Sequence, residues 1–277
     1  MGNLLIKLKT FGLFETLLFS LLGLIVLGVF SIIPSLNSQR YASPDETAVA
    51  LVTTRLAAFK SPRISEPGAV TYPWLHPRSW VSQGAALVPV GFLGWPLLLV
   101  PWVALFGTWL LPWLGSLAIL SASYPLFRLL RTVFSMRASL VGVLVAYASP
   151  MVILYANRGL FPNTGFLAVA IWSVWLMVQY RTLGQRGWLA GLFIGLAFSI
   201  RPIELAWLLP WWVWAGWRGK TWKEVRGWRL EAGGWRWGAT LGLVAVAMLL
   251  LHSSVYGHWW MIGYWLDTFR YRDTINR

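Results

Sequence analysis

Two adjacent acidic residues, Asp45 and Glu46, are the first candidates for chemistry in this sequence. Acid is scarce here, since the 277 residues include only 9 Asp and Glu against 23 Lys and Arg. A carboxylate at this place can act as a general base or a metal ligand, or it can cap the first turn of a helix. Because Glu46 has the capping-box position three residues after Ser43, we expect Glu46 to be structural and Asp45 to be the candidate base.

Arg201 and Glu204 form the second candidate pair. They are the only charged residues between positions 187 and 217. Ionisable groups in such apolar sequence are costly, so they are candidates for function. Their i, i+3 spacing allows an ion pair on one helix face, and the Arg201 guanidinium alternatively suits a phosphate group. Both interpretations stay open.

Three further polar residues lie in segments that we expect to connect apolar helices. Arg158 and Asn163 belong to a Gly/Pro/Asn-rich stretch that is either an ordinary turn or a source of positive charge for a cavity. His76 is the single histidine of the long polar segment before residue 84. No two histidines have the spacing of a metal pair. The sequence neither indicates nor excludes a bound divalent metal ion, and it indicates no cofactor.

The composition predicts a polytopic membrane protein, because 57% of the residues are hydrophobic and only 12% are charged. The net charge of +14 does not indicate nucleic-acid binding, since Lys and Arg lie in short segments between apolar runs. That distribution is typical of the positive-inside rule. Without cysteine there is neither a disulfide framework nor a thiolate site.

The apolar runs predict an all-α fold with about seven transmembrane helices in a single membrane domain, 1–277. The N-terminus is expected inside and the C-terminus outside, with a short outer tail at 257–277. An outer loop at 34–107 is expected to contain an amphipathic juxtamembrane helix, 44–59, and an interfacial or re-entrant segment, 86–106. The predicted spans are 11–33, 108–127, 138–156, 164–180, 187–201, 202–217 and 236–256.

Three segments, in this order, resemble the membrane-embedded glycosyltransferases of the C superfamily. They are residues 44–47 (Pro-Asp-Glu-Thr) before the predicted helix, 127–137 before a span that ends at an outer turn, and 191–202 before another apolar span. The bacterial relatives of protein O-mannosyltransferases and of lipid A aminoarabinose transferases are the nearest in pattern. The resemblance covers most of residues 1–256.

The resemblance implies transfer of a sugar from a polyprenyl-phosphate carrier to an acceptor hydroxyl or amine, at the outer face of a bacterial inner membrane. Asp45 would take the acceptor's proton, and Arg201, followed by Arg158, would stabilise the phosphate. Glu204, His76 and Asn163 are the remaining candidates for substrate binding.

This sequence departs from the family's pattern in two ways. Relatives commonly have an acid in the second outer turn, where this chain has Asn163, and many are longer. The second hypothesis is therefore a non-catalytic membrane scaffold or assembly subunit that keeps the fold, with a protein partner completing the acceptor site. A lipid or sugar transporter is a third, which the long uncharged runs do not favour.

Overall fold

The computed structural model describes residues 43–183, 187–204 and 234–258, with single positions at 23, 28, 41, 206, 208 and 210. Nearly all of the predicted span 11–33, most of the predicted span 202–217 and nearly all of the tail 257–277 lie outside these residues. The described chain is mostly helical, as the composition predicted.

The described helices are α2 (Pro44–Ala57), α3 (Gly68–Thr71), α4 (Gly94–Phe106), η1 (Thr108–Leu110, a 3-10 turn), α5 (Leu111–Leu130), α6 (Met136–Tyr147), α7 (Pro150–Asn157), α8 (Pro162–Leu183), α9 (Gly187–Ile200) and α12 (Gly234–Tyr256). The strands are β1 (Ile64–Ser65), β2 (Trp80–Gln83) and β3 (Ala86–Pro89).

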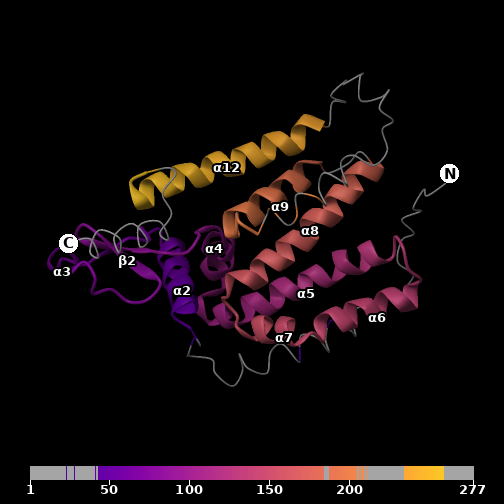
Figure 1. Cartoon of the computed structure of the whole chain (residues 1–277), viewed down its shortest axis with the longest axis horizontal. Helices are drawn as coiled ribbons and strands as arrows, with labels where there is room; N and C mark the ends of the chain where they lie inside the picture. The colour runs from indigo at the N-terminus through magenta and orange to yellow at the C-terminus, as the bar shows by residue number, and fades with distance from the viewer. Residues whose placement is uncertain are drawn as a thin grey trace.

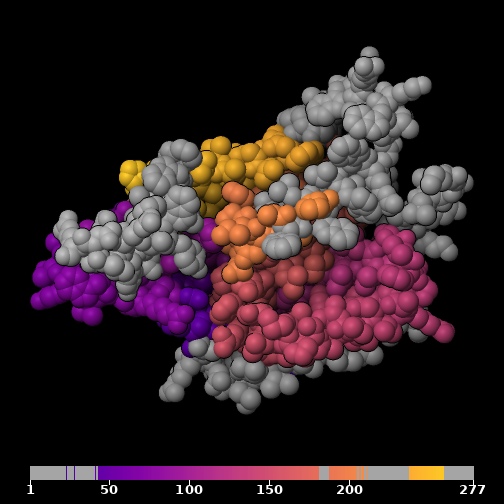
Figure 2. Space-filling view, viewed as in Figure 1, coloured from indigo at the N-terminus to yellow at the C-terminus, as the bar shows by residue number. Residues whose placement is uncertain are grey.

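The long helices lie in a row in the order α12, α9, α8, α5 and α6 (Figure 1). In the space-filling view, α12 and the α5–α6 pair form opposite edges, with α9 between them (Figure 2). The strands, α2 and the last turn of α12 gather at one end of this row, which we call the sheet end. The connection between α5 and α6, which includes Arg131, lies at the opposite end, and Arg137 follows in the first turn of α6.

Two glycines bring α9 close to α12. A Cβ atom on Gly191 would lie 2.1 Å from the backbone oxygen of Trp237, and one on Gly195 would lie 2.8 Å from Cβ of Val244. The two glycines are four residues apart and share a helix face. This G-x-x-x-G spacing lets helix backbones approach closely, which is a common way for helices to pack within membranes.

Within the described ranges, two helical segments, Thr108–Leu130 and Trp237–Tyr256, are long and apolar enough to cross a membrane. A third crossing is available if α6 and α7, which are bent by 62° at their junction, form one broken span. The prediction of one continuous helix over 138–156 is therefore wrong, because this range contains two helices. Pro150 causes the break, because proline disfavours helical geometry in the residue before it, and Ser149 has an extended ψ of 128°. Seven spans and their orientation stay predictions.

A small three-stranded antiparallel sheet, with the order β1-β3-β2, was not expected from the sequence. β2 and β3 form a hairpin in which Gln83 pairs with Ala86. Gly84 has a φ of 59° at the first position of the two-residue connection, where a tight hairpin favours glycine. The expectation of an all-α chain is therefore too simple at the sheet end.

Helix α2 begins as predicted and ends two residues earlier. The hydroxyl of Ser43 accepts a hydrogen bond from the Glu46 N–H at 3.3 Å, and Pro44 follows as the first helical residue. The predicted end at 59 is wrong, because Phe59 has a φ of 54° and its side chain is 99% exposed. Lys60 N–H bonds to Arg55 O at 2.8 Å, a Schellman-type ending that stops the helix.

The predicted interfacial segment 86–106 is not one element, because it contains β3 and the separate helix α4. A Cβ atom on Gly94, the first residue of α4, would lie 2.3 Å from the backbone carbon of Ser199 near the end of α9. The chain leaves α4 at Gly107 and enters η1 and α5. A helix of this length reaches only about 20 Å, which is shorter than the roughly 30 Å of a bilayer core.

The end of α12 is bound to the sheet by hydrogen bonds to its last carbonyl groups. Arg63 Nη1 donates to the oxygen of Val255 at 3.2 Å, and Gln83 Nε2 donates to the oxygen of Tyr256 at 2.6 Å. The Tyr256 hydroxyl in turn donates to Pro89 O at 3.0 Å. These bonds pair carbonyls that a helix leaves unsatisfied, and they fix the last helix to the segment that follows α2.

Candidate functional site

Asp45 lies half-buried in the first turn of α2, where Ser79 donates a hydrogen bond from its hydroxyl to Oδ1 of the carboxylate. Ser79 directly precedes β2 and is 34 positions further along the chain. Its φ of 71° is in the left-handed region, which residues with a Cβ rarely adopt. The structure thus places the candidate base at the junction of α2 and the sheet.

Glu46 is 2% exposed and lies against the N-cap of α2. Its Oε2 is 3.4 Å from the Ser43 hydroxyl, which also receives the Glu46 N–H. Burial, and then the negative charge of Glu46, raise the pKa of the nearby Tyr41 phenol above its ordinary value. These contacts agree with the structural role expected of Glu46.

Arg201 and Glu204 form an ion pair just after α9 ends. Their side chains are 32% and 33% exposed. An ion pair at this exposure contributes little stability, about 0–1 kcal/mol. The ion pair, one of the two interpretations left open by the sequence, is present, but in the turn after α9 and not on a helix face. Arg201 therefore already has an anionic partner in this arrangement.

Arg158 and Asn163 lie on either side of a tight turn between α7 and α8. The Arg158 guanidinium carbon lies 5.7 Å from the centre of the Phe161 ring, which is within the range of a cation–π contact. Asn163 is at the start of α8, and its buried Oδ1 has no hydrogen-bond partner among the residues that the structure describes. An unpaired buried acceptor costs free energy, so this amide oxygen is a place where a donor group would be stabilised.

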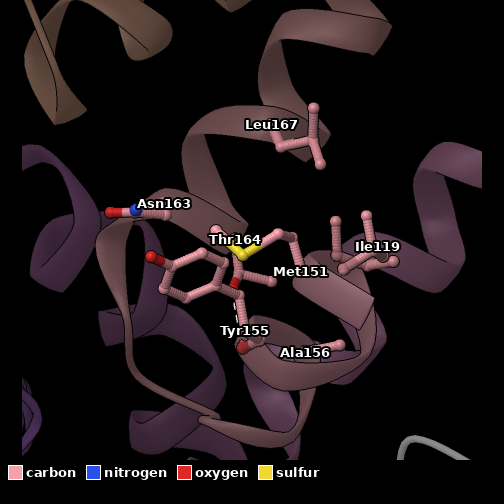
Figure 3. A pocket seen from close by; sticks show the side chains of 8 residues that line it. Ile119, Met151, Tyr155, Ala156, Asn163, Thr164 and Leu167 are labelled. Carbon is pink, nitrogen blue, oxygen red and sulfur yellow. Dashed lines mark hydrogen bonds between the residues drawn. The ribbon is translucent and has the colours of Figure 1, made fainter. Parts of the chain in front are cut away.

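Next to Asn163 there is an apolar pocket of about 130 Å³ (Figure 3). Its walls come from α5, α7 and the first turns of α8, and they include Ile119, Met151 and Tyr155. The Asn163 amide points away from Met151 and Ile119 in this view. The lining residues do not include Asp45, Arg158, Arg201 or Glu204.

The segments that contain Asp45, Arg158 and Arg201 all contribute residues to one buried hydrophobic cluster. Val49, one turn after Asp45, belongs to this cluster, as do Leu160, two residues after Arg158, and Ile200, the residue before Arg201. Trp95 of α4 is 1% exposed in the same cluster, and its Nε1 donates to the oxygen of Leu160 at 3.1 Å. The fold thus brings residues far apart in the sequence to the sheet end.

No hydrogen bond or ion pair joins Asp45 to Arg158 or Arg201 within the described ranges. His76 lies three residues before Ser79, and its Nδ1 is 3.3 Å from the oxygen of Pro77. No group of three His, Asp or Glu side chains in the described part of the chain is arranged to hold a metal ion.

Two residues of the site were missed by the sequence analysis. Ser79 gave no signal, because its contact with Asp45 depends on how the loop between α2 and β2 folds back. Trp95 was treated as one residue of an apolar run. Its indole N–H donates to Leu160 O in the turn that follows Arg158, and no sequence pattern predicts that bond. A prediction of the hairpin around Gly84 would have placed Ser79 directly before β2, but its contact with α2 depends on tertiary packing.

Over the described residues, the protein is mostly helical, with two or three helices long and apolar enough to cross a membrane and a small three-stranded sheet at one end. Comparison with protein-family models, with curated proteins and with solved structures found no match.

Proposed function

We propose that this chain is a membrane-embedded glycosyltransferase that uses a polyprenyl-phosphate-linked sugar as donor. The observation that carries the proposal is the placement of Asp45, a half-buried carboxylate with a hydroxyl donor, beside the same buried cluster that joins the segments of Arg158 and Arg201. A base and two cations at one end of a helix row supply the groups that sugar transfer from a phosphate carrier requires.

The proposed reaction is a single displacement at the anomeric carbon. The acceptor's hydroxyl or amine gives its proton to the free oxygen of Asp45, and its heteroatom forms the new bond to the anomeric carbon. The bond between that carbon and the phosphate oxygen breaks, and the phosphate leaves with the electron pair. Arg201 or Arg158 would stabilise the charge that develops on this leaving group.

The proposal places the sheet end at the outer face of a bacterial inner membrane. The charge distribution supports this orientation, because Arg128, Arg131 and Arg137 lie at the opposite end and basic residues favour the inside. α4 begins beside the end of α9 and leads into the start of α5, which is consistent with a segment that does not cross. A seven-span core with the N-terminus inside is part of the same proposal.

A non-catalytic scaffold that keeps this fold is the second candidate. Two observations favour it: Arg201 is already paired with Glu204, and the apolar pocket beside Asn163 does not reach Asp45. A scaffold would bind a membrane or protein partner and would not discharge a donor lipid.

Sugar transfer in reconstituted vesicles separates the two candidates. The purified chain is supplied with a radiolabelled polyprenyl-phosphate sugar and a mixture of hydroxyl and amine acceptors. We expect transfer by the wild type, a loss of transfer in Asp45→Asn, and unchanged transfer in Glu66→Gln, which alters an exposed acid of the same loop. Absence of transfer with every donor and acceptor would favour the scaffold, and equal transfer in wild type and Asp45→Asn would remove Asp45 as base.

A further inference from the structure

We propose that Ser79 is a positioning residue for Asp45, an inference that rests on the function proposed above. The Ser79 hydroxyl donates to Oδ1 of Asp45. The bond engages one carboxylate oxygen, and among the described residues no side chain donates to the other, which we propose accepts the proton. A base that is held in one orientation loses less freedom when the reaction begins than one that rotates.

The backbone of Ser79 is fixed on both sides. The N–H of Val90, the residue directly after β3, donates to the oxygen of Ser79 at 3.0 Å, and the N–H of Trp80 donates to the oxygen of Pro77 at 3.1 Å. The sheet thus sets the position of Cβ and directs the hydroxyl toward the start of α2. A serine donor on a rigid strand end orients its partner more closely than a donor on a free loop.

The left-handed backbone at Ser79, with φ at 71°, is a conformation that favours glycine and tolerates asparagine. A serine at this position is strained relative to glycine, and the hydroxyl bond to Asp45 is the contact that glycine would lack. Such strain at a residue that touches a reactive group is a known feature of functional sites.

A purely structural role is the competing explanation. The same bond joins the first turn of α2 to the beginning of β2, and a bond of this kind can hold two elements together. In that case stability and activity would fall together whenever the bond is removed. If Ser79 positions Asp45, turnover falls without a matching loss of stability.

The choice of substitution separates the bond from the strain. Ser79→Gly removes the hydroxyl and also removes the strain of a left-handed backbone, so we expect no loss of folding stability from strain. Ser79→Ala removes the hydroxyl and keeps the strain. Ser79→Asn tolerates the left-handed backbone and offers an amide N–H as a donor. Ser65→Ala, an exposed serine of the same sheet, is the matched control.

Turnover, donor KM and thermal unfolding are measured for each variant in reconstituted vesicles. We expect Ser79→Gly to lower kcat on the order of 10- to 100-fold, with donor KM unchanged and the unfolding midpoint no lower than that of the wild type. Ser79→Asn recovers part of kcat, and Ser65→Ala matches the wild type. In an Asp45→Asn background, Ser79→Gly has no further effect. Wild-type kcat in Ser79→Gly, or a loss that only follows the loss of folded protein, would overturn the proposal.

A second readout does not depend on transferase activity. A water-soluble carbodiimide with an added amine labels accessible carboxyl groups, and peptide mass spectrometry gives the rate at Asp45. Ser79→Gly is expected to raise this rate severalfold, and Ser79→Asn to return it toward that of the wild type. Equal labelling in all three proteins would overturn the positioning role even if no donor substrate had been found, whereas altered labelling without any turnover would contradict only the proposed function.

Discussion

The close approach of α9 to α12 gives a prediction whose size can be worked from the structure. A Cβ atom on Gly191 would lie 2.1 Å from the Trp237 carbonyl oxygen. Carbon and oxygen atoms ordinarily approach no closer than about 3.3 Å, so Gly191→Ala must move one backbone by about 1 Å. The obstacle is a helix carbonyl, which cannot rotate away as a side chain can.

Overpacking of a tight core costs about 1–3 kcal/mol, and a clash between two backbones belongs at the upper limit. For domains of 150–250 residues, each 1 kcal/mol shifts the unfolding midpoint by roughly 2–4 °C. We therefore expect Gly191→Ala to lower the midpoint by roughly 6–12 °C. Gly195→Ala should have a smaller effect, because its Cβ atom would lie 2.8 Å from Cβ of Val244, a milder overlap than the 2.1 Å at Gly191.

Thermal unfolding in mild detergent, followed by intrinsic tryptophan fluorescence, is the assay. Gly238→Ala on α12 is the matched control, since nothing lies within 4 Å of a Cβ atom there. We expect it to be neutral or stabilising, because alanine favours helix. Equal midpoints for wild type and Gly191→Ala, or a loss no larger than that of Gly238→Ala, would refute the packing of α9 on α12.

Three further predictions concern topology, pH and the cation of the site. The chain has no cysteine, so a single introduced cysteine can be labelled specifically. Leu75→Cys should be labelled by an impermeant thiol reagent in intact cells, whereas Val133→Cys should be labelled only after the membrane is opened. The reverse pattern would contradict the proposed orientation. Since the pKa of Tyr41 is raised in the folded state, the unfolded chain ionises first, so stability is present below about pH 10 and falls as the pH rises above it. Tyr41→Phe should reduce that alkaline loss in unfolding measurements, and an identical pH dependence would contradict the assignment. Glu204→Gln removes the anionic partner of Arg201, so the donor KM should fall by up to about fivefold if Arg201 binds the phosphate. Arg201→Gln should raise the donor KM. An unchanged KM in both variants would remove Arg201 from the donor site.

The sequence predicted the local features of the fold well. The start of α2 followed from Ser43 and Pro44, because the N-cap and the first helical position have strong residue preferences. The last span followed from hydropathy alone, with 236–256 predicted and α12 found at Gly234–Tyr256. These features depend on neighbours a few residues apart, which is the range over which such patterns are informative.

Features that depend on distant residues were not predicted. The break at Pro150 was passed over because the apolar run continues through it, although proline restricts the residue before it. The hairpin around Gly84 was taken for part of an outer loop and an interfacial segment. The predicted helix 44–59 included Phe59, and the Schellman ending instead stops α2 before it and leaves its side chain exposed.

In the candidate site, too, local features could be predicted from the sequence and contacts between distant residues could not. The i, i+3 spacing of Arg201 and Glu204 allowed the ion pair that the structure contains, although the pair lies in a turn and not on a helix face. The contact between Asp45 and Ser79 was not foreseen, because it joins residues 34 positions apart through a sheet that the sequence analysis did not include. The shared cluster of Val49, Leu160 and Ile200 is likewise a result of tertiary packing.

The most direct test of the central claim is the turnover of Asp45→Asn at saturating donor, beside that of the wild type. A general base contributes about 10²- to 10⁴-fold, so kcat should fall by an amount in that range. Binding of a fluorescent donor should be unchanged, because asparagine has nearly the same shape as aspartate. Wild-type turnover in Asp45→Asn would contradict the account, as would a loss that is explained entirely by weaker donor binding.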